Sequence, residues 1–337
     1  MRKSVTPVRL AVGGVVLLVL AFALLMTTTS SAYLIVPDRA HPLAGLVRVP
    51  GEKPDSDGGG IYYVDVVERK ATLLERIFPS LRSGSTLVQH NQITPPGVTD
   101  PQRIQADRLA MQFSQQIASA VALYALGYKV AIHQDGVRVA LVYRNTHAYG
   151  TLRPGDVIVA ADGKHVRSTT ELRGVLIHHK VGDVVSIAFV RDGKRHNVRI
   201  ATSQDPADSK RAILGFQPQP ALRIQVPFKI KFDLGNVGGP SAGLAFALQI
   251  LEARGRDVDH GYRVAATGEI TADGSVGPIG GIKQKTIGAR RAHADVFLVP
   301  AGENYVEARK YAHGLRLIPV KSFQQALRAL ATLPRKH

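Results

Sequence analysis

Two short glycine-rich blocks, residues 235–250 and 267–285, constrain the fold of this chain more than any other part of its sequence. The first block places Ser241 after Gly238, Gly239 and Pro240, and an apolar segment follows it. Glycine adopts backbone conformations that other residues resist, and proline in the first turn of a helix sacrifices no hydrogen bond. The pattern therefore predicts that Ser241 lies at the N-terminus of a buried helix, where free backbone N–H groups collect.

The second block ends in a tight turn at Gly280 and Gly281, and Lys283 is expected to begin another helix. A serine hydroxyl is a weak nucleophile unless a base removes its proton. A lysine that is buried can act as this base, because desolvation lowers its pKa toward neutrality. The two blocks together indicate nucleophilic chemistry, with free N–H groups near Ser241 available to a developing oxyanion.

The blocks resemble the two signature motifs of the Lon-type serine protease domain, and the resemblance covers residues 221–332. It implies a Ser–Lys dyad in which Ser241 is the nucleophile and Lys283 is the base, with Thr267 in support. Lys285 is expected to face solvent or to pair with an acid. The residues whose backbone is expected to form the oxyanion site are Gly239, Pro240, Ser241 and Ala242.

This chain departs from the family pattern at Gly238 and in the preceding strand, residues 228–232, which lacks the family's frequent histidines. It also allows two other interpretations. Many Lon-type domains carry an acidic residue three positions before the serine, where this chain has Gly238. Residues 239–243 also satisfy G-x-S-x-G, the nucleophile motif of α/β-hydrolases, with Asp295 and His313 downstream as the partners that such a site would need. Alternatively, the first block is only a structural helix start, and Lys283 lies on the surface.

The N-terminal region is expected to anchor the chain in a membrane. Residues 10–36 carry no charge, whereas residues 1–9 are short and basic. An apolar stretch of this length is sufficient to span a bilayer, and the charge distribution predicts a cytoplasmic N-terminus and an extracytoplasmic body. A cleaved signal peptide is the alternative. Residues 37–136 are expected to form a stalk followed by an α/β region with a long helix at 101–126.

Residues 137–201 contain the phrase that begins at Leu152 and reads LRPGDVIVAADGKHV, which resembles the core of PDZ domains. PDZ domains bind peptides by adding them as a strand at a sheet edge. The expected receiving strand is 137–142, and the expected groove residues are Val137, Val139, Leu141 and Leu172. The alternative is a PDZ fold that only packs against the protease. Residues 202–220 are expected to be a linker and 221–337 to be the proteolytic domain.

The amino-acid composition limits the classes of binding partner that we expect. The 337 residues carry 43 basic and 26 acidic side chains, for a net charge of +17. Only 6% of the residues are aromatic, so we expect no nucleic-acid binding despite the positive charge. Cysteine is absent, which suits an extracytoplasmic chain. No spacing of metal ligands and no phosphate loop of the form G-x-x-x-x-G-K-[ST] occurs, so we expect neither metal, cofactor nor ATP.

The predicted fold class is α+β and multidomain, with a transmembrane helix, a β-rich PDZ-like domain and a Lon-type proteolytic domain. The arrangement resembles the membrane-anchored PDZ–Lon-like proteases of Gram-positive bacteria. That resemblance implies an ATP-independent serine endopeptidase at the outer face of the membrane. Its substrates would be flexible exported polypeptides, and its PDZ domain would bind a substrate or a regulator. It also implies a hexamer. The competing hypotheses are a noncatalytic scaffold and an enzyme that cleaves only its own stalk near residues 37–60.

Overall fold

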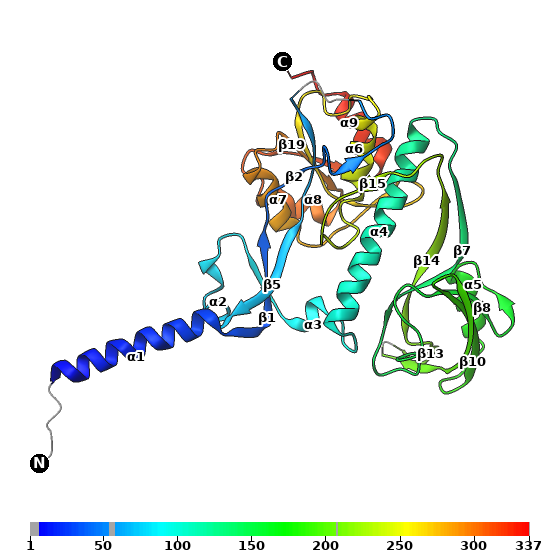
Figure 1. Cartoon of the computed structure of the whole chain (residues 1–337), viewed down its shortest axis with the longest axis horizontal. Helices are drawn as coiled ribbons and strands as arrows, with labels where there is room; N and C mark the ends of the chain where they lie inside the picture. Colours follow the sequence, from blue (N-terminus) through cyan, green and yellow to red (C-terminus); the bar gives the residue numbers. More distant parts are fainter. Residues whose placement is uncertain (1–6, 54–57, 207, 337) are drawn as a thin grey trace, which may run out of the picture.

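The computed structural model describes residues 7–53, 58–206 and 208–336 (Figure 1). Its central feature is a sheet with the strand order β2-β4-β16-β19-β20. Strands β4, β16, β19 and β20 are parallel, and β2 pairs with β4 in the antiparallel direction. The bounds of these strands are β2 His41–Pro42, β4 Gly60–Tyr63, β16 Arg263–Ala266, β19 Val296–Pro300 and β20 Arg316–Val320.

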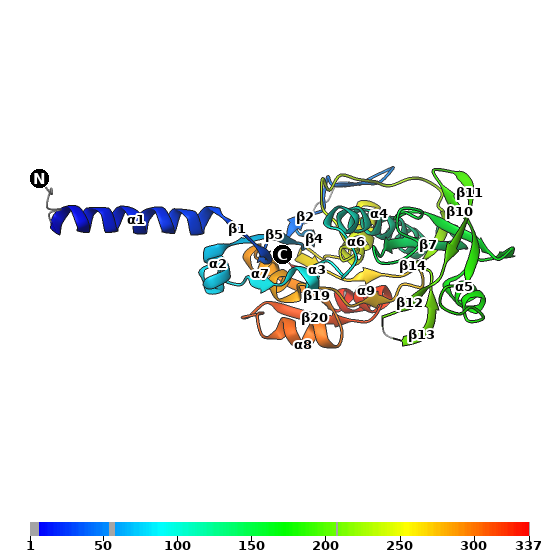
Figure 2. The same ribbon diagram turned by 90° about the horizontal axis from the view of Figure 1, so that it is seen from below.

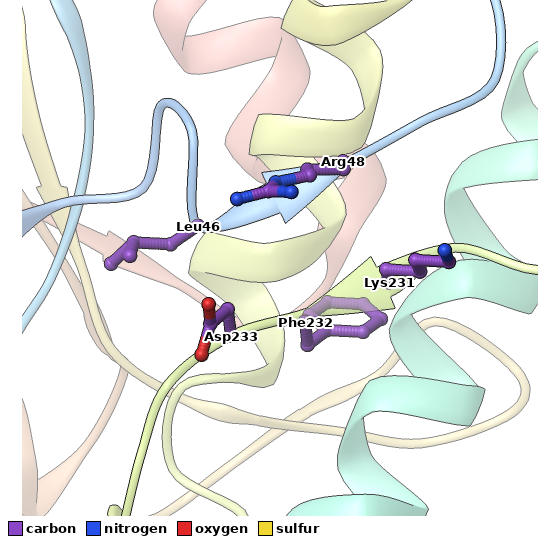
Figure 3. A pocket seen from close by; sticks show the side chains of 5 residues that line it. All are labelled: Leu46, Arg48, Lys231, Phe232 and Asp233. Carbon is purple, nitrogen blue, oxygen red and sulfur yellow. The ribbon is translucent and has the colours of Figure 1, made fainter.

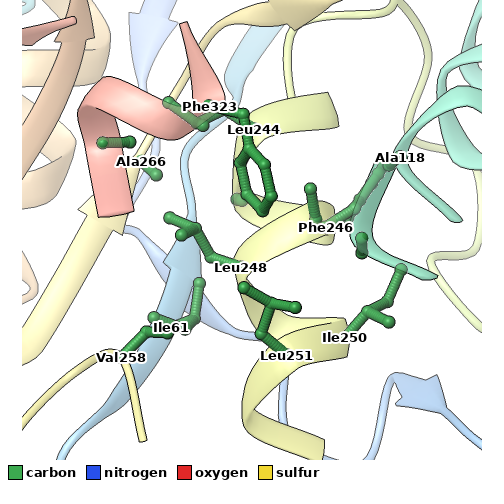
Figure 4. Close-up of a cluster of buried hydrophobic side chains, with 14 of the residues drawn as sticks. Ile61, Ala118, Leu244, Phe246, Leu248, Ile250, Leu251, Val258, Ala266 and Phe323 are labelled. Atoms are coloured by element: carbon green, nitrogen blue, oxygen red, sulfur yellow. The ribbon is translucent and has the colours of Figure 1, made fainter. Parts of the chain in front are cut away.

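Five helices pack around this sheet. The helix α6 is apolar on all sides, which is the pattern of a helix buried in a core. Its residues Leu244, Phe246 and Leu248 are fully buried against α4, β4 and α9 (Figure 4). A second apolar cluster lies between β19, α7 and α8. The helices are α4 Asp100–Ala125, α6 Gly243–Ala253, α7 Ile282–Arg291, α8 Glu303–Arg309 and α9 Phe323–Ala331.

The expectation of a stalk at residues 37–60 is wrong. Leu43, Val47 and Val49 are buried in the same core as α6, because this segment supplies an apolar side chain at each of these positions. Strand β3, Val47–Arg48, pairs with β15, Lys231–Phe232, which directly precedes the first glycine-rich block. The proteolytic domain therefore includes chain segments on both sides of the PDZ-like region.

The long helix expected at 101–126 is present as α4, and Thr99 caps its N-terminus. It is preceded by a small sheet of order β5-β1-β6, which α7 contacts through β1. Short helical segments connect these strands. The bounds are β1 Thr29–Pro37, β5 Val66–Thr72, β6 Thr86–Val88, α2 Leu73–Ile77, η1 Pro79–Leu81 and α3 His90–Ile93.

The N-terminal helix α1, Pro7–Thr27, projects away from the rest of the chain (Figures 1 and 2). Its apolar side chains are exposed, with Leu17 at 68% and Leu18 at 72%. The expected anchor at 10–36 does not form one helix, because the chain turns into strand β1 after Thr27. Within the described part of the chain, no helix combines the length and apolarity that a membrane crossing requires. Residues 1–6 of the expected cytoplasmic segment lie outside the described residues.

The central β-rich domain is a sheet of order β11-β10-β8-β7-β14, with the short strand β9 paired to β8. Its core includes Val139, Ile158, Ile187 and Phe189, each buried on one face of the sheet. Helix α5, Thr169–Leu176, is capped by Ser168 and buries Leu172 in the same core. The strands are β7 Ala131–Val142, β8 Val157–Ala161, β9 Lys164–His165, β10 Val184–Arg191, β11 Lys194–Ala201 and β14 Phe216–Gln225.

The linker expected at 202–220 is largely ordered into strands. Strands β12, Ser203–Asp205, and β13, Asp208–Ile213, form a hairpin, and β14 then pairs with β7 along its whole length. Together, β7 and β14 form a two-stranded connection that contacts α4 and joins the central domain to the proteolytic domain (Figure 1).

Candidate active site

Ser241 lies directly before Ala242, the N-cap of α6, at the end of a loop that we call the nucleophile loop (residues 235–242). Gly239 adopts a left-handed backbone with φ of 85°, which explains the requirement for glycine there. The prediction that Ser241 is at the start of a buried helix is confirmed by its position. It follows that the hydroxyl is presented where helix N–H groups are unpaired.

Four hydrogen bonds fix the backbone of this loop. The Gly239 N–H donates to the Asp107 carbonyl at 2.9 Å, and the Ser114 hydroxyl donates to the Pro240 carbonyl at 2.9 Å. The Ser241 carbonyl accepts from the Gly268 N–H at 2.8 Å and from the Thr267 hydroxyl at 3.0 Å. The loop is thus held by α4 on one side and by the second glycine-rich block on the other.

The side chain that reaches Ser241 is Lys285. Its Nζ lies 2.6 Å from Ser241 Oγ and 3.2 Å from Thr267 Oγ1. Lys285 is only 3% exposed. Burial lowers the pKa of its amine to about 8, and the negative charge of Asp65 opposes this shift. A neutral amine within hydrogen-bond distance of a hydroxyl has the geometry of a general base beside a nucleophile.

The expectation that Lys283 is the base disagrees with this geometry. Lys283 Nζ instead donates to the Ser85 carbonyl at 3.1 Å and lies over the ring of Tyr311, 5.6 Å from its centroid. Residues two positions apart on a helix point to opposite sides. Because α7 begins at Ile282, only one of the two lysines can face α6, and that lysine is Lys285. The expectation that Lys285 faces solvent or pairs with an acid is wrong for the same reason.

Thr267 is the first residue of the second glycine-rich block, lies directly after β16 and is fully buried. Its hydroxyl donates to the Ser241 carbonyl and accepts from Lys285, so it links the loop to the lysine. This arrangement orients the amine toward Ser241. It gives Thr267 the supporting position that was expected, but beside Lys285 rather than Lys283.

Two of the expected oxyanion donors are excluded by chemistry and geometry. Pro240 has no N–H, and the N–H of Gly239 is occupied by Asp107. Among the hydrogen bonds of the described residues, none uses the N–H of Ser241 or Ala242 as a donor. These two groups therefore remain as the candidates for binding an oxyanion.

Position 238, where the family pattern has an acidic residue, is tightly packed against α4. A Cβ on Gly238 would lie 3.1 Å from the Cβ of Asp107, because α4 packs directly on the loop. Asp107 itself supplies an acidic group here and pairs with Arg103 at 3.1 Å. Burial raises the pKa of the Asp107 carboxyl.

A second charged group lies behind Lys285. Asp65 follows β4, and burial raises the pKa of its carboxyl. His41 lies between Asp65, at 3.8 Å, and Asp38, at 3.4 Å. The ligand atoms of these three residues are close enough together to hold a metal ion, as are those of Glu252, Asp257 and Asp259. The expectation of no metal and no cofactor stays a prediction.

The prediction that Val137, Val139, Leu141 and Leu172 line a peptide groove of the PDZ-like domain disagrees with the structure. Val137, Val139 and Leu141 lie on β7, which has β8 on one side and β14 on the other. All three are buried, and Leu172 is 3% exposed in the domain core. A strand that already has two neighbours offers no open edge to a peptide. The free edge next to β7 is therefore that of β14, a strand that the sequence interpretation assigned in part to a linker.

A hollow of about 330 Å³ lies between β3 and β15, and Figure 3 shows its lining side chains. Arg48 and Lys231 contribute positive charge, and Asp233 contributes negative charge. Phe232 also packs against Phe246 of α6, with ring centroids 5.2 Å apart. Its lining residues differ from those around Ser241, so this hollow is separate from the dyad.

Comparisons with known proteins agree with the two domains. Residues 224–332 match the family described as Lon protease (S16) C-terminal proteolytic domain, and residues 125–202 match the PDZ domain family. The chain is 38% identical to Lon protease 2 of Thermus thermophilus over 104 residues, which cover 28% of this chain and 13% of that protein. It is 30% identical to Lon protease of Chloroflexus aggregans over 213 residues, covering 61% of this chain and 23% of that protein.

Among solved structures, a PDZ domain of an SdrC-like protein from Listeria monocytogenes is 28% identical to this chain. The match covers 25% of this chain and 87% of the other, with a TM-score of 0.23. The two family matches show that the chain contains a PDZ domain and a Lon C-terminal protease domain. It is homologous to Lon proteases but spans less than a quarter of the length of these two relatives. This homology supports a serine peptidase.

Sequence reasoning missed the contributions of residues 37–136 to the site. Asp65, Asp107 and Ser114 all come from this region, which carries no motif. One signal was present for Ser114. It occupies a position in the apolar stripe of α4, between Met111 and Ile117, where a hydroxyl needs a partner from another element.

Proposed function

We propose that this protein is an ATP-independent serine endopeptidase in which Ser241 is the nucleophile and Lys285 is the general base. The observation that carries the proposal is the 2.6 Å separation of Lys285 Nζ and Ser241 Oγ in a buried site that lowers the pKa of the amine to about 8. The homology to Lon proteases supports the reaction class. The absence of a phosphate loop from the 337 residues is the reason for proposing independence from ATP.

The reaction follows from the contacts. Neutral Lys285 takes the proton of Ser241 as the Oγ attacks a peptide carbonyl. The N–H groups of Ser241 and Ala242 bind the oxyanion, and each such donor contributes roughly 3–4 kcal/mol in comparable sites. Protonated Lys285 gives its proton to the leaving amine. It then activates the water that hydrolyses the acyl-enzyme, while Thr267 keeps the amine oriented.

We propose unfolded or flexible polypeptides as the substrates, because Ser241 lies at the start of α6 with Ser114 of α4 and Lys285 of α7 beside its loop, and an extended backbone enters such a site more readily than a folded surface. We propose that the enzyme lies at the outer face of a membrane and that its apolar N-terminal segment attaches it there. The uncharged run at 10–36 and the exposed apolar side chains of α1 favour this location. Exported polypeptides would then be the accessible substrates. Assembly into a hexamer is proposed only from the resemblance to Lon-type domains.

Peptide binding by the PDZ domain is proposed at the outer edge of β14 rather than at β7. Pro218 and Pro220 offer no N–H to an added strand, so the section 221–225 is the better receiver. This section leads directly into the segment that ends in the nucleophile loop. A ligand that adds there would therefore bind next to the chain that carries Ser241.

The test is cleavage of unfolded casein by the full chain in detergent micelles, with and without ATP, beside Ser241→Ala. Cleavage that does not change with ATP and is lost in Ser241→Ala supports the proposal. Equal silence of both proteins, with peptide binding retained, favours the noncatalytic scaffold. Cleavage confined to the chain's own residues 37–60 would favour self-processing, although the burial of Leu43, Val47 and Val49 disfavours access there. Extraction of the chain from membranes by carbonate would contradict the anchor.

A further inference from the structure

Ser114 makes a contact that the dyad does not explain. It lies in the middle of α4, is 2% exposed and donates its hydroxyl to the Pro240 carbonyl at 2.9 Å. Pro240 is 126 positions away in the sequence and directly precedes the nucleophile. A serine inside a helix commonly bonds to the carbonyl four residues earlier in its own helix. Ser119 of the same helix does this, with its hydroxyl 2.7 Å from the Gln115 carbonyl.

The packing around Ser114 is close enough to make its hydroxyl position specific. A Cβ on Gly243 would lie 2.8 Å from Ser114 Oγ and 2.8 Å from the Cγ2 of Ile270. Only glycine therefore fits where α6 begins opposite this hydroxyl. The close approach of the two helices brings Ser114 Oγ within reach of the nucleophile loop.

The carbonyl that Ser114 holds belongs to the same peptide group as the N–H of Ser241. A peptide group is planar, with its carbonyl and its N–H on opposite sides. A hydrogen bond that fixes the direction of the Pro240 carbonyl therefore also fixes the direction of the Ser241 N–H. This N–H is one of the two donors left for an oxyanion, since Gly239 is occupied and Pro240 has none.

We propose that Ser114 is a positioning residue for catalysis, which aims the Ser241 N–H at the oxyanion by holding the Pro240–Ser241 peptide plane. This inference rests on the proposed peptidase function. Ser114 acts through the loop backbone and touches neither the substrate nor Lys285. Without its hydroxyl, the Pro240 carbonyl keeps only a long contact with the Gly243 N–H at 3.3 Å.

The expected effect is on the transition state rather than on substrate binding. Removing one oxyanion donor outright lowers kcat about 10²- to 10³-fold in a comparable site. Misaiming a donor costs less, so Ser114→Ala should lower kcat on the order of tenfold to a hundredfold with KM nearly unchanged. A peptide boronate forms a tetrahedral adduct on a nucleophilic serine. Its affinity should fall by a similar factor, because the adduct places an oxygen in the oxyanion position.

The experiment measures kcat, KM and boronate Kd for the full chain, for Ser114→Ala and for the matched control Ser119→Ala. The control also removes a buried hydroxyl from α4, but its bond lies within the helix. A loss confined to Ser114→Ala, in kcat and boronate affinity but not in KM, supports the inference. Ser114→Cys, which has a similar volume but a weaker donor, should also lower kcat and boronate affinity, and it serves if the alanine variant is unstable.

Two results would overturn the inference. One is Ser114→Ala with kcat and boronate Kd within twofold of the wild type. The other is an equal loss in Ser119→Ala, which would mean that α4 acts only through general stability. Calorimetric boronate titration does not depend on turnover, so it reads the oxyanion geometry directly. A wild type that neither cleaves casein nor binds the boronate would refute the proposed function itself, whereas an active wild type with a fully active Ser114→Ala refutes only this inference.

Discussion

The titration of Lys285 should govern the pH dependence of peptide cleavage. Only the neutral amine can take the proton of Ser241, and burial lowers the pKa of this amine to about 8. Roughly one lysine in ten is then neutral at pH 7 and nine in ten at pH 9. We expect kcat/KM to rise about tenfold between pH 7 and pH 9 and then to level off.

A base that is an exposed lysine would give a different pH profile of kcat/KM. With an ordinary pKa of about 10.4, the neutral fraction would rise roughly a hundredfold between pH 7 and pH 9 and would continue to rise to pH 10. Stopped-time assays with a fluorogenic peptide from pH 6 to pH 10 separate the two curves. A limb centred near pH 10, or a flat profile, would refute the assignment of Lys285 as a buried base.

Two variants identify the titrating group that causes kcat/KM to rise with pH. The charge of Asp65 raises the pKa of Lys285 against the effect of burial, so Asp65→Asn should move the limb to lower pH and increase the relative rate at pH 7. Glu252 is the control, because burial raises the pKa of its carboxyl to about 7. It lies toward the other end of α6, where it accepts from the Asp259 N–H at 2.7 Å. Glu252→Gln should leave the rise of kcat/KM with pH unchanged. If that rise disappears in Glu252→Gln, the titrating group is Glu252 and not Lys285.

Three further predictions concern stability. Lys285→Met should raise the free energy of unfolding at pH 7 by about 3 kcal/mol in denaturant melts, because the pKa of Lys285 is about 8 in the folded chain and 10.5 in the unfolded chain, so protonation favours unfolding. This gain in stability should shrink as the pH rises from 8 to 10.5, and a gain that grows with pH would contradict the prediction. Phe246→Ala should lower the free energy of unfolding by about 3–5 kcal/mol, whereas Val306→Ala, at 60% exposure, should change it by less than about 0.5 kcal/mol, and equal effects would count against the core. Gly243→Ala should lower both Tm and kcat because its Cβ would meet Ser114 and Ile270, whereas Gly280→Ala, with no atom within 4 Å of its Cβ, should change Tm by about a degree or two at most. Wild-type Tm and kcat in Gly243→Ala would show that α4 and α6 can separate freely.

The sequence predicted the proteolytic site as far as local patterns reach. The glycines, Pro240 and the apolar run after Ser241 set a helix start, and the structure has one there. The choice between Lys283 and Lys285 depended on which side of α7 faces α6. That is set by the starting residue of the helix and by tertiary packing, neither of which the motif fixes.

The regions without motifs were predicted less well, for a physical reason. Leu43, Val47 and Val49 lie between prolines and glycines and read as a stalk, yet they complete the core of a sheet whose other strands come some 200 positions later. Long-range pairing of this kind leaves no local periodicity. The same holds for β14, whose two prolines suggest a linker although it pairs with β7 throughout. Proline is tolerated at a sheet edge, and that is where β14 lies.

The most direct test of the Ser241–Lys285 dyad compares casein cleavage by the wild type with that by Ser241→Ala, Lys285→Met and Lys283→Met. Ser241→Ala and Lys285→Met should each lose cleavage by at least about three orders of magnitude while remaining folded. Lys283→Met should keep most of the wild-type rate, because its amine bonds to the Ser85 carbonyl and not to Ser241. Loss of cleavage in Lys283→Met with activity retained in Lys285→Met would contradict the dyad that the geometry supports.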